Sequence, residues 1–385
     1  MKKILFIWLS LLVSADLFAQ AFDHFGARAL GMGGAYVAMA DDLSAVYWNP
    51  AGLGIAPPRG VMVSVSAAGS DRKDTINNVE SLVDMNLAAS GRIITPGDIS
   101  KAIDLLETLA EKGNGVTGEA NANFIFKYDD FGFSVLTLGN AAAIPIINLD
   151  ILNFDPYSGQ PLPTDLPKLN FSGVIAREFI GSYTHSIIEN TLWAGVNAKY
   201  IQADTYYSSR LIVDPNNKKL RLRDLVNEAK GPNKRSTSKF GLDLGIMGIV
   251  AENLRIGVVA RDVTGPTLES AGLVKVKMNP QYRMGVSYAI LPALMVAADY
   301  DLSKNDEGIF GEAVREFAFG GEGRLFRRHL AIRGGMCRNV HIEGTRWQFA
   351  AGIGFDSTHV AVDVGGTTDA KSNRIGAAIT GTVRF

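Results

Sequence analysis

The feature that most constrains the fold of this chain is a regular alternation of apolar residues with polar or small ones from about residue 190 onward. Residues 240–246 read FGLDLGI and residues 282–290 read YRMGVSYAI, so every second residue is apolar. A period of two residues predicts strands with two unlike faces. The pattern therefore predicts an all-β protein.

We expect fourteen strands, an even number, because such segments recur between turn signals along the chain. They are predicted at residues 60–68, 119–127, 131–139, 170–184, 191–203, 238–250, 253–263, 279–290, 293–302, 314–326, 329–338, 345–356, 358–366 and 373–385.

The connections between these strands alternate in length. Tight turns are predicted at Asp129-Asp130, Glu189-Asn190, Ala251-Glu252, Leu291-Pro292, Arg327-Arg328 and Ser357. Long connections are predicted at 69–118, 140–169, 204–237, 264–278, 303–313, 339–344 and 367–372. Alternation alone also fits a soluble β-sandwich, whose apolar face packs in a core. Short turns at one end and long loops at the other favour an up-and-down antiparallel transmembrane β-barrel of the outer membrane.

The polar face of the later strands carries both signs of charge. In a barrel this face lines the lumen, and in a soluble sheet it would face water. Mixed signs favour internal ion pairs and an ordered filling over a wide selective pore. The predicted luminal charges are Lys199, Asp243, Arg255, Arg283, Asp299, Glu322, Arg324, Arg333 and Asp363.

The first residues have the features of a secretory signal peptide. Lys2 and Lys3 precede a short apolar run, and small residues follow at Ala19 and Ala21. We therefore expect a signal peptide at 1–21, an N-terminal hatch at 22–58 and a barrel at 59–385. No later run of 18 apolar residues occurs, which argues against a helical membrane protein.

The stretch 31–54, GMGGAYVAMADDLSAVYWNPAGLG, is small, mostly apolar and without a strand or helix period. Because it precedes the first strand, it can enter the barrel from the periplasmic side. Its glycines permit close backbone approach and positive φ, and its proline biases the preceding residue away from helix. We predict a hatch, or plug, inside the lumen, with Gly31, Gly33, Gly34, Asn49, Pro50, Ala51 and Gly52 as its key residues.

The stretch 27–53, ARALGMGGAYVAMADDLSAVYWNPAGL, resembles the N-terminal signature of the FadL superfamily of outer-membrane barrels. The most similar branches are the PorV/PorQ-like proteins and the barrel family that bears the conjugal transfer name TraF. KFGLDLGIMG (239–248), LRIGVVARDVTGPTL (254–268), MNPQYRMGVSYAI (278–290) and MVAADYDLSKND (295–306) support the TraF branch. The resemblance implies a fourteen-stranded barrel with a hatch.

The resemblance also implies two functions. The fatty-acid-transporter branch implies uptake of hydrophobic, fatty-acid-like small molecules, which we take as the expected function in the cell outer membrane. The PorV and TraF branches imply the alternative, a non-transporting partner of a secretion or conjugal transfer system. Other expected partners are outer-membrane lipid, lipopolysaccharide and the barrel assembly machinery. The last is expected because ITGTVRF, ending in Phe385, resembles the terminal-strand signal that this machinery reads.

The segment 141–154, AAAIPIINLDILNF, is too apolar for an ordinary exposed loop. We predict that Ile144, Ile146, Ile147, Leu149 and Leu152 form a ligand-capture loop; alternatively, the segment folds over the barrel mouth or partly continues a strand. Residues 98–112 and 220–230 are predicted helices. The basic run 216–223 either faces lipopolysaccharide phosphates or is solvated.

Several classes of function have no support in the sequence. No GxSxG, HExxH or paired catalytic carboxylates occur, and GMGG lacks the context of a phosphate-binding loop. The single cysteine, Cys337, excludes an intramolecular disulfide, and five scattered histidines indicate no metal site. A net charge of -1 gives no basic excess for nucleic acid. We expect no enzyme activity, no cofactor, no metal and no nucleic-acid partner.

Overall fold

The computed structural model describes residues 25–85, 95–111, 113–148, 166–214, 220–269, 276–306, 313–326, 329–341, 345–371 and 373–385. The predicted signal peptide, Leu149, Leu152, the Arg327-Arg328 turn and the first part of the basic run 216–223 lie outside the described residues.

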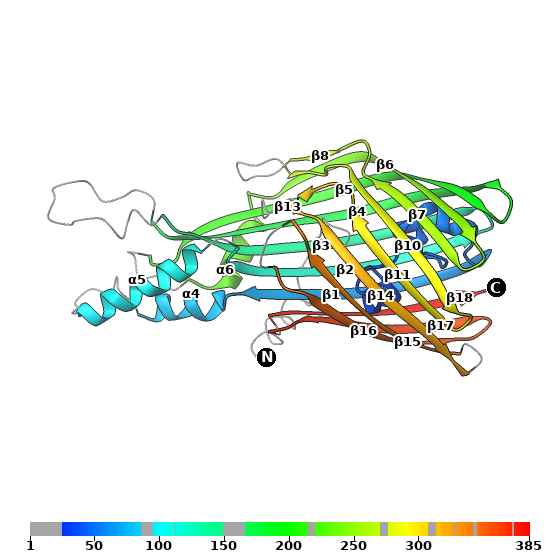
Figure 1. The fold of residues 1–385 in the computed structure, drawn as a ribbon. Coiled ribbons are helices and arrows are strands. Elements are labelled where there is room, and N and C mark those ends of the chain that lie inside the picture. Colours follow the sequence, from blue (N-terminus) through cyan, green and yellow to red (C-terminus); the bar gives the residue numbers. More distant parts are fainter. Residues whose placement is uncertain are drawn as a thin grey trace.

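Fourteen antiparallel strands close into a barrel (Figure 1). They are β1 Arg59–Arg72, β2 Gly115–Tyr128, β3 Phe131–Ile146, β4 Lys168–Ile188, β5 Leu192–Leu211, β6 Arg235–Ala251, β7 Leu254–Arg261, β10 Gln281–Leu291, β11 Leu294–Asp301, β14 Glu316–Leu325, β15 Leu330–Asn339, β16 Gln348–Asp356, β17 Val360–Asp369 and β18 Arg374–Arg384. β1 pairs with β18, so the sheet has no open edge. The predicted fold class and strand number are confirmed.

Two short hairpins extend from the wall. β8 Thr267–Leu268 pairs with β9 Val276–Lys277, and β12 Asn305–Asp306 pairs with β13 Ala313–Val314.

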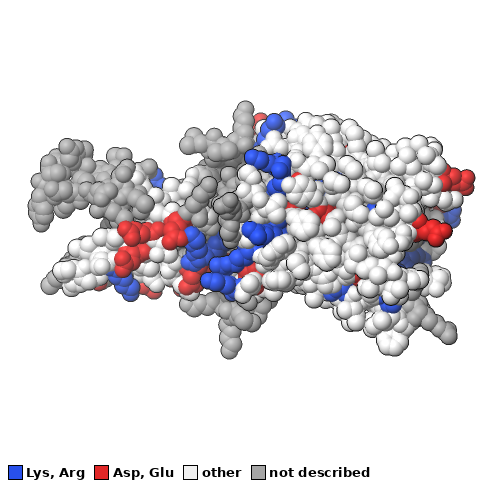
Figure 2. Space-filling view, in the orientation of Figure 1, with Lys and Arg blue, Asp and Glu red and all other residues white. Residues whose placement is uncertain are grey.

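The outer face of the wall is apolar because successive residues of a strand point to opposite sides. Phe240, Phe319 and Ile353 are exposed on the outside, whereas Asp243 and Glu322 of the same strands are buried. Figure 2 shows a largely uncharged barrel surface, with Lys and Arg concentrated where it borders the helical end. Such a surface is suited to contact with lipid.

The two ends of the barrel differ. Tight turns join β2 to β3 and β10 to β11 at one end, which is the periplasmic end of such barrels. The other end carries three helices, α4 Thr75–Asp84, α5 Pro96–Ala110 and α6 Leu222–Ala229 (Figure 1). The predicted helices at 98–112 and 220–230 are confirmed by α5 and α6. In the described residues, no helix combines the length and apolar character needed to cross a membrane.

The predicted ligand-capture segment, residues 141–154, is not a loop over its whole described length. β3 continues to Ile146, and Ile144 and Ile146 lie opposite Asn170 and Lys168 of β4. Alternation is lost at this end of β3 because both of its faces are covered, as the buried Ala142 and Ala143 show. The prediction of a loop from residue 141 was therefore wrong for residues 141–146.

The segment before β1, residues 25–58, lies inside the barrel, and we call it the plug (Figure 1). It contains α2 Ala27–Gly31, α3 Ala45–Trp48 and the 3-10 helix η1 Pro50–Gly54. The rings of Phe25 and Tyr47 stack with centroids 4.4 Å apart, and the Trp48 indole N–H donates to the carbonyl of Phe25 at 2.9 Å. These aromatic contacts join the start of the plug to α3.

Candidate functional site

The barrel wall meets the plug along a row of inward-facing glycines, which we call the glycine track. Eight glycines form it as four directly opposed pairs: Gly195 with Gly245, Gly257 with Gly285, Gly320 with Gly335, and Gly352 with Gly365. They come from β5, β6, β7, β10, β14, β15, β16 and β17. The track therefore runs along most of the barrel circumference.

The plug backbone lies directly on this track. A Cβ at Gly335 would overlap the backbone of Met32 and Gly33, and one at Gly195 would overlap the backbone of Pro50. No side chain could occupy these positions without moving the plug. Glycine is therefore needed on the wall as well as in the plug.

Asn49 fixes the part of the plug that contacts β6. Its side-chain amide donates to the carbonyls of Val37 at 3.3 Å and Ile246 at 3.1 Å, and its Oδ1 accepts from the N–H of Ala51 at 3.2 Å. The backbone of Asn49 is extended, and Pro50 opens η1. One side chain thus links two plug segments to the wall.

The predicted plug glycines differ in their backbone conformation and in the atoms that they contact. Gly33 and Gly34 have φ of 65° and 84°, which favours glycine at both positions. The Cα of Gly31 lies against Gly352 of the track, whereas Gly52 lies against the plug's own Ala40 carbonyl.

An ion-pair network centred on Arg28 ties the plug to the wall. The Arg28 guanidinium lies 2.8 Å from Glu322 of β14, 2.6 Å from Asp41 and 3.2 Å from Asp42. Buried charges of this kind require several partners to offset the cost of desolvation. The wall extends the network: Arg333 and Arg324 also contact Glu322, Arg333 contacts Asp363, and Arg255 contacts Asp41.

A second group of charges lies beside α3. Lys199 contacts Asp243 at 2.8 Å and Asp262 at 2.5 Å. Asn197 donates to Asp243 at 3.0 Å and to the carbonyl of Val46 in the plug at 2.8 Å. This group therefore also holds the plug.

A third polar contact involves β11. Oδ2 of Asp299 accepts from the backbone N–H groups of Tyr36 and Val37, both at 2.8 Å. Nearby Arg283 pairs with Asp301 at 2.5 Å and Glu316 at 3.0 Å. All nine charged residues predicted from the sequence to line the lumen lie on inward faces of their strands. Their functional role stays a prediction.

Sequence reasoning missed Arg28, Asp41 and the glycine track. An arginine in an otherwise small, apolar segment was an available signal for Arg28. Glycines near the middle of successive predicted strands were the signal for the track, although only strand pairing shows that they face one another.

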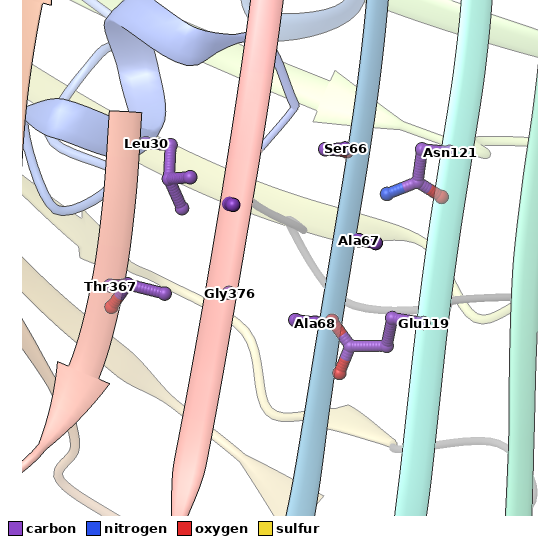
Figure 3. Close-up of a pocket in the computed structure, with 9 residues that line it drawn as sticks. Leu30, Ser66, Ala67, Ala68, Glu119, Asn121, Thr367 and Gly376 are labelled. Carbon is purple, nitrogen blue, oxygen red and sulfur yellow. The ribbon is translucent and has the colours of Figure 1, made fainter. Parts of the chain in front are cut away.

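Where the track ends at β17, the plug leaves a small gap in which Leu30 faces β17, β18, β1 and β2 (Figure 3). The cavity volume of the gap is about 20 Å³, room for about one water molecule. Its lining residues are mostly small: Leu30, Ser66, Ala67, Ala68, Glu119, Asn121, Thr367, Gly376 and Ala377. We call this space the plug–wall gap.

A separate apolar cluster lies at the helical end. Leu82 of α4, Leu109 of α5 and Leu225 of α6 are buried in it, and Ile147 packs against it. The side chain of Phe171 on β4 packs against both this cluster and the apolar cluster of the lumen and plug. Phe171 lies on the same face of β4 as the exposed Phe179 and Tyr183, so this contact is on the outward side of the wall.

Phe385 follows β18 and is exposed, and its recognition by assembly machinery stays a prediction. Among the described residues, no group of three or more His, Cys, Asp or Glu side chains could hold a metal ion.

Comparison with protein families identifies the chain. Residues 46–301 match the family described as F plasmid transfer operon, TraF, protein. The chain belongs to this family. A search of curated proteins found no match.

Solved structures show the same fold. The toluene transporter TbuX of Ralstonia pickettii matches with a TM-score of 0.57 and 15% identity, over 95% of this chain and 100% of TbuX. A FadL homologue of Pseudomonas aeruginosa matches with a TM-score of 0.55 and 11% identity, over 96% and 100%. The monoaromatic hydrocarbon channel CymD matches with a TM-score of 0.54 and 13% identity, over 95% and 99%. This TraF-family protein has the fold of the FadL-type outer-membrane barrels.

Proposed function

We propose that this protein mediates uptake of hydrophobic, fatty-acid-like small molecules across the outer membrane. The observation that carries the proposal is the apolar cluster beneath α4, α5 and α6 at the helical end. The toluene transporter TbuX and the hydrocarbon channel CymD share this fold, which supports the same class of function.

Capture begins at the helical end. The cluster under α4, α5 and α6 offers buried apolar side chains at the end opposite the tight turns. An apolar molecule gains free energy by leaving water for such a surface. Ile147, a predicted capture residue, packs on this cluster, and Ile146 is exposed on β3 beside it.

Passage of the ligand through the barrel then requires the plug to move. The plug is buried and tied to β6, β11 and β14 by Asn49, Asp299 and Glu322. A ligand proceeds when the plug shifts near Asn49 and Pro50. No step makes or breaks a covalent bond, and we propose no enzyme activity.

Uptake of radiolabelled palmitate by cells of a Gram-negative host that lacks its own fatty-acid barrel tests the proposal. We expect faster uptake with the wild-type protein than with an empty vector. Phe171→Asp should reduce uptake because it places a charge against the apolar cluster of the helical end, whereas the exposed Asn77→Asp on α4 is the control. Equal uptake with and without the protein contradicts the proposal.

The alternative is a non-transporting partner of a secretion or conjugal transfer system, favoured by membership of the TraF family. It predicts no palmitate uptake together with co-purification of secretion or conjugation proteins. Lipopolysaccharide and the assembly machinery remain proposed partners.

A further inference from the structure

The outer rim of the barrel wall carries two arginines that have aromatic neighbours. Arg315 immediately precedes β14, and Arg338 is the last residue but one of β15. Both lie at the end of the wall opposite the tight turns, which is the end that faces outward in outer-membrane barrels. Figure 2 shows Lys and Arg gathered along this border on the face in view.

Strand alternation turns both arginine side chains to the outside of the wall. Phe319 and Ile332 are exposed on the outer face of β14 and β15, and the two arginines are an even number of residues away from them. The N–H of Val340 donates to the carbonyl of Arg315 at 2.7 Å, so Arg315 and Arg338 are diagonal neighbours. Such neighbours lie about 7–8 Å apart, and both guanidinium groups can therefore reach one anion.

Aromatic rings position the two guanidinium groups at the rim. Cζ of Arg315 lies 5.9 Å from the ring centroid of Tyr300, and Cζ of Arg338 lies 5.9 Å from that of Trp347. Nη2 of Arg315 also donates to the carbonyl of Leu302 at 3.2 Å. Aromatic side chains on the outer face of a barrel mark the boundary between the hydrocarbon and the lipid head groups. The two cations therefore lie at the depth of the head groups.

Neither arginine has a carboxylate partner in the part of the chain that the structure describes. There, the hydrogen bond from Arg315 to Leu302 is the only one that either guanidinium makes, and both side chains are partly exposed. The acidic residues of β11 and β14 face the lumen, where they bind the plug or Arg283: Asp299, Asp301, Glu316 and Glu322. The outer rim of β14 and β15 therefore carries positive charge that these strands do not balance.

A similar arginine at the periplasmic rim is neutralised by the protein itself. Cζ of Arg59 lies 4.3 Å from the ring centroid of Tyr128, but this guanidinium also pairs with Asp129 at 3.3 Å. The two rims thus share an arginine over an aromatic ring and differ in the source of the anion. At the outer rim the available anions are those of the membrane, and the outer leaflet is distinguished by the phosphate groups of lipopolysaccharide.

We propose that Arg315 and Arg338 form a binding site for a phosphate group of lipopolysaccharide on the outer rim of β14 and β15. A guanidinium matches phosphate oxygens with two parallel hydrogen bonds, which a lysine cannot reproduce. The acyl chains of the same lipid lie along the apolar outer face that includes Phe319 and Ile332. The inference is independent of what passes through the barrel, so the palmitate assay does not decide it.

Binding of lipid A, the phosphorylated anchor of lipopolysaccharide, tests the site. The purified protein in detergent micelles is titrated with lipid A that carries both phosphates, and native mass spectrometry measures the bound fraction. Dephosphorylated lipid A and phosphatidylglycerol are the comparison lipids. Heat-modifiable migration on gels establishes that each variant is folded.

We expect Arg315→Gln and Arg338→Gln each to weaken binding of phosphorylated lipid A about tenfold, the effect of one hydrogen bond to a charged group. Replacing both arginines by lysine should preserve more binding than replacing both by glutamine, because lysine keeps the charge but loses the paired hydrogen bonds. Arg59→Gln is the matched control and should bind as the wild type does, since Asp129 already neutralises Arg59.

Equal binding of phosphorylated and dephosphorylated lipid A overturns the inference. Unchanged binding in both glutamine variants, or the same loss in Arg59→Gln, does so as well. Phosphatidylglycerol that binds as tightly as lipid A, with the same dependence on Arg315 and Arg338, would assign the site to anionic phospholipid and overturn the assignment to lipopolysaccharide.

Discussion

The two sides of the plug are held by different physical means. On the glycine track the contact is backbone against backbone, reinforced by ion pairs of Arg28 and hydrogen bonds of Asn49. At β18, Leu30 instead packs against the small side chain of Ala378, beside the plug–wall gap. The comparison teaches that backbone contacts and ion pairs hold the plug along the track, whereas small apolar side chains contact it beside the gap.

The largest effect is expected from filling the track. Gly335→Leu inserts a side chain where Met32 and Gly33 lie, and overpacking of this kind should lower the free energy of unfolding by about 3 kcal/mol. Denaturant unfolding in lipid vesicles measures it. Gly334→Leu is the matched control, because no atom lies within 4 Å of its added Cβ. Equal loss in both variants contradicts a special role for the track.

Removing the central charge of the network should have the next largest effect. Arg28→Gln leaves Asp41 and Glu322 with fewer partners, and we expect a loss of about 2 kcal/mol. Arg59→Gln breaks an exposed pair with Asp129 and should cost less than about 1 kcal/mol. The same unfolding measurement compares them, and a smaller loss for Arg28→Gln than for Arg59→Gln argues against the network.

A smaller loss in the free energy of unfolding is expected when Asn49 is replaced. Asn49→Ala leaves the carbonyls of Val37 and Ile246 without this donor and should cost about 1 kcal/mol. Proteolysis of the folded protein should become faster within the plug. Asn77→Ala removes only an exposed hydrogen bond to Asp74 and serves as the control. Identical proteolysis of the two variants would mean that Asn49 does not hold the plug.

The smallest effect on stability is expected in the gap. Ser66→Val adds apolar volume beside open space and should change the free energy of unfolding by less than about 0.5 kcal/mol. A loss of stability comparable with that of Gly335→Leu would show that the two sides do not differ.

The barrel could be predicted from the sequence because the later strands have one face in lipid and one in the lumen. Residues 282–290 illustrate how that contrast produces a clean period of two. The end of β3 could not be predicted, because helices cover its outer extension and both faces become apolar. The local sequence pattern does not show which strand segments are covered by helices that are distant in the sequence.

The plug was predictable as a segment but its attachment was not. Glycines and the Asn49-Pro50 turn indicate close backbone approach, whereas the partners of Arg28 depend on strand order around a closed barrel. Glu322 is separated from Arg28 by 294 positions in the chain. No local periodicity connects residues so far apart.

Hydrogen–deuterium exchange of the folded protein in nanodiscs tests the central claim, that the plug is fixed inside the barrel, most directly. The amides of Tyr36 and Val37 donate to the buried Asp299, so peptides covering residues 27–54 should exchange as slowly as those of β11 and β14. Exchange of these peptides within seconds, while the strands stay protected, would contradict a plug held against the wall.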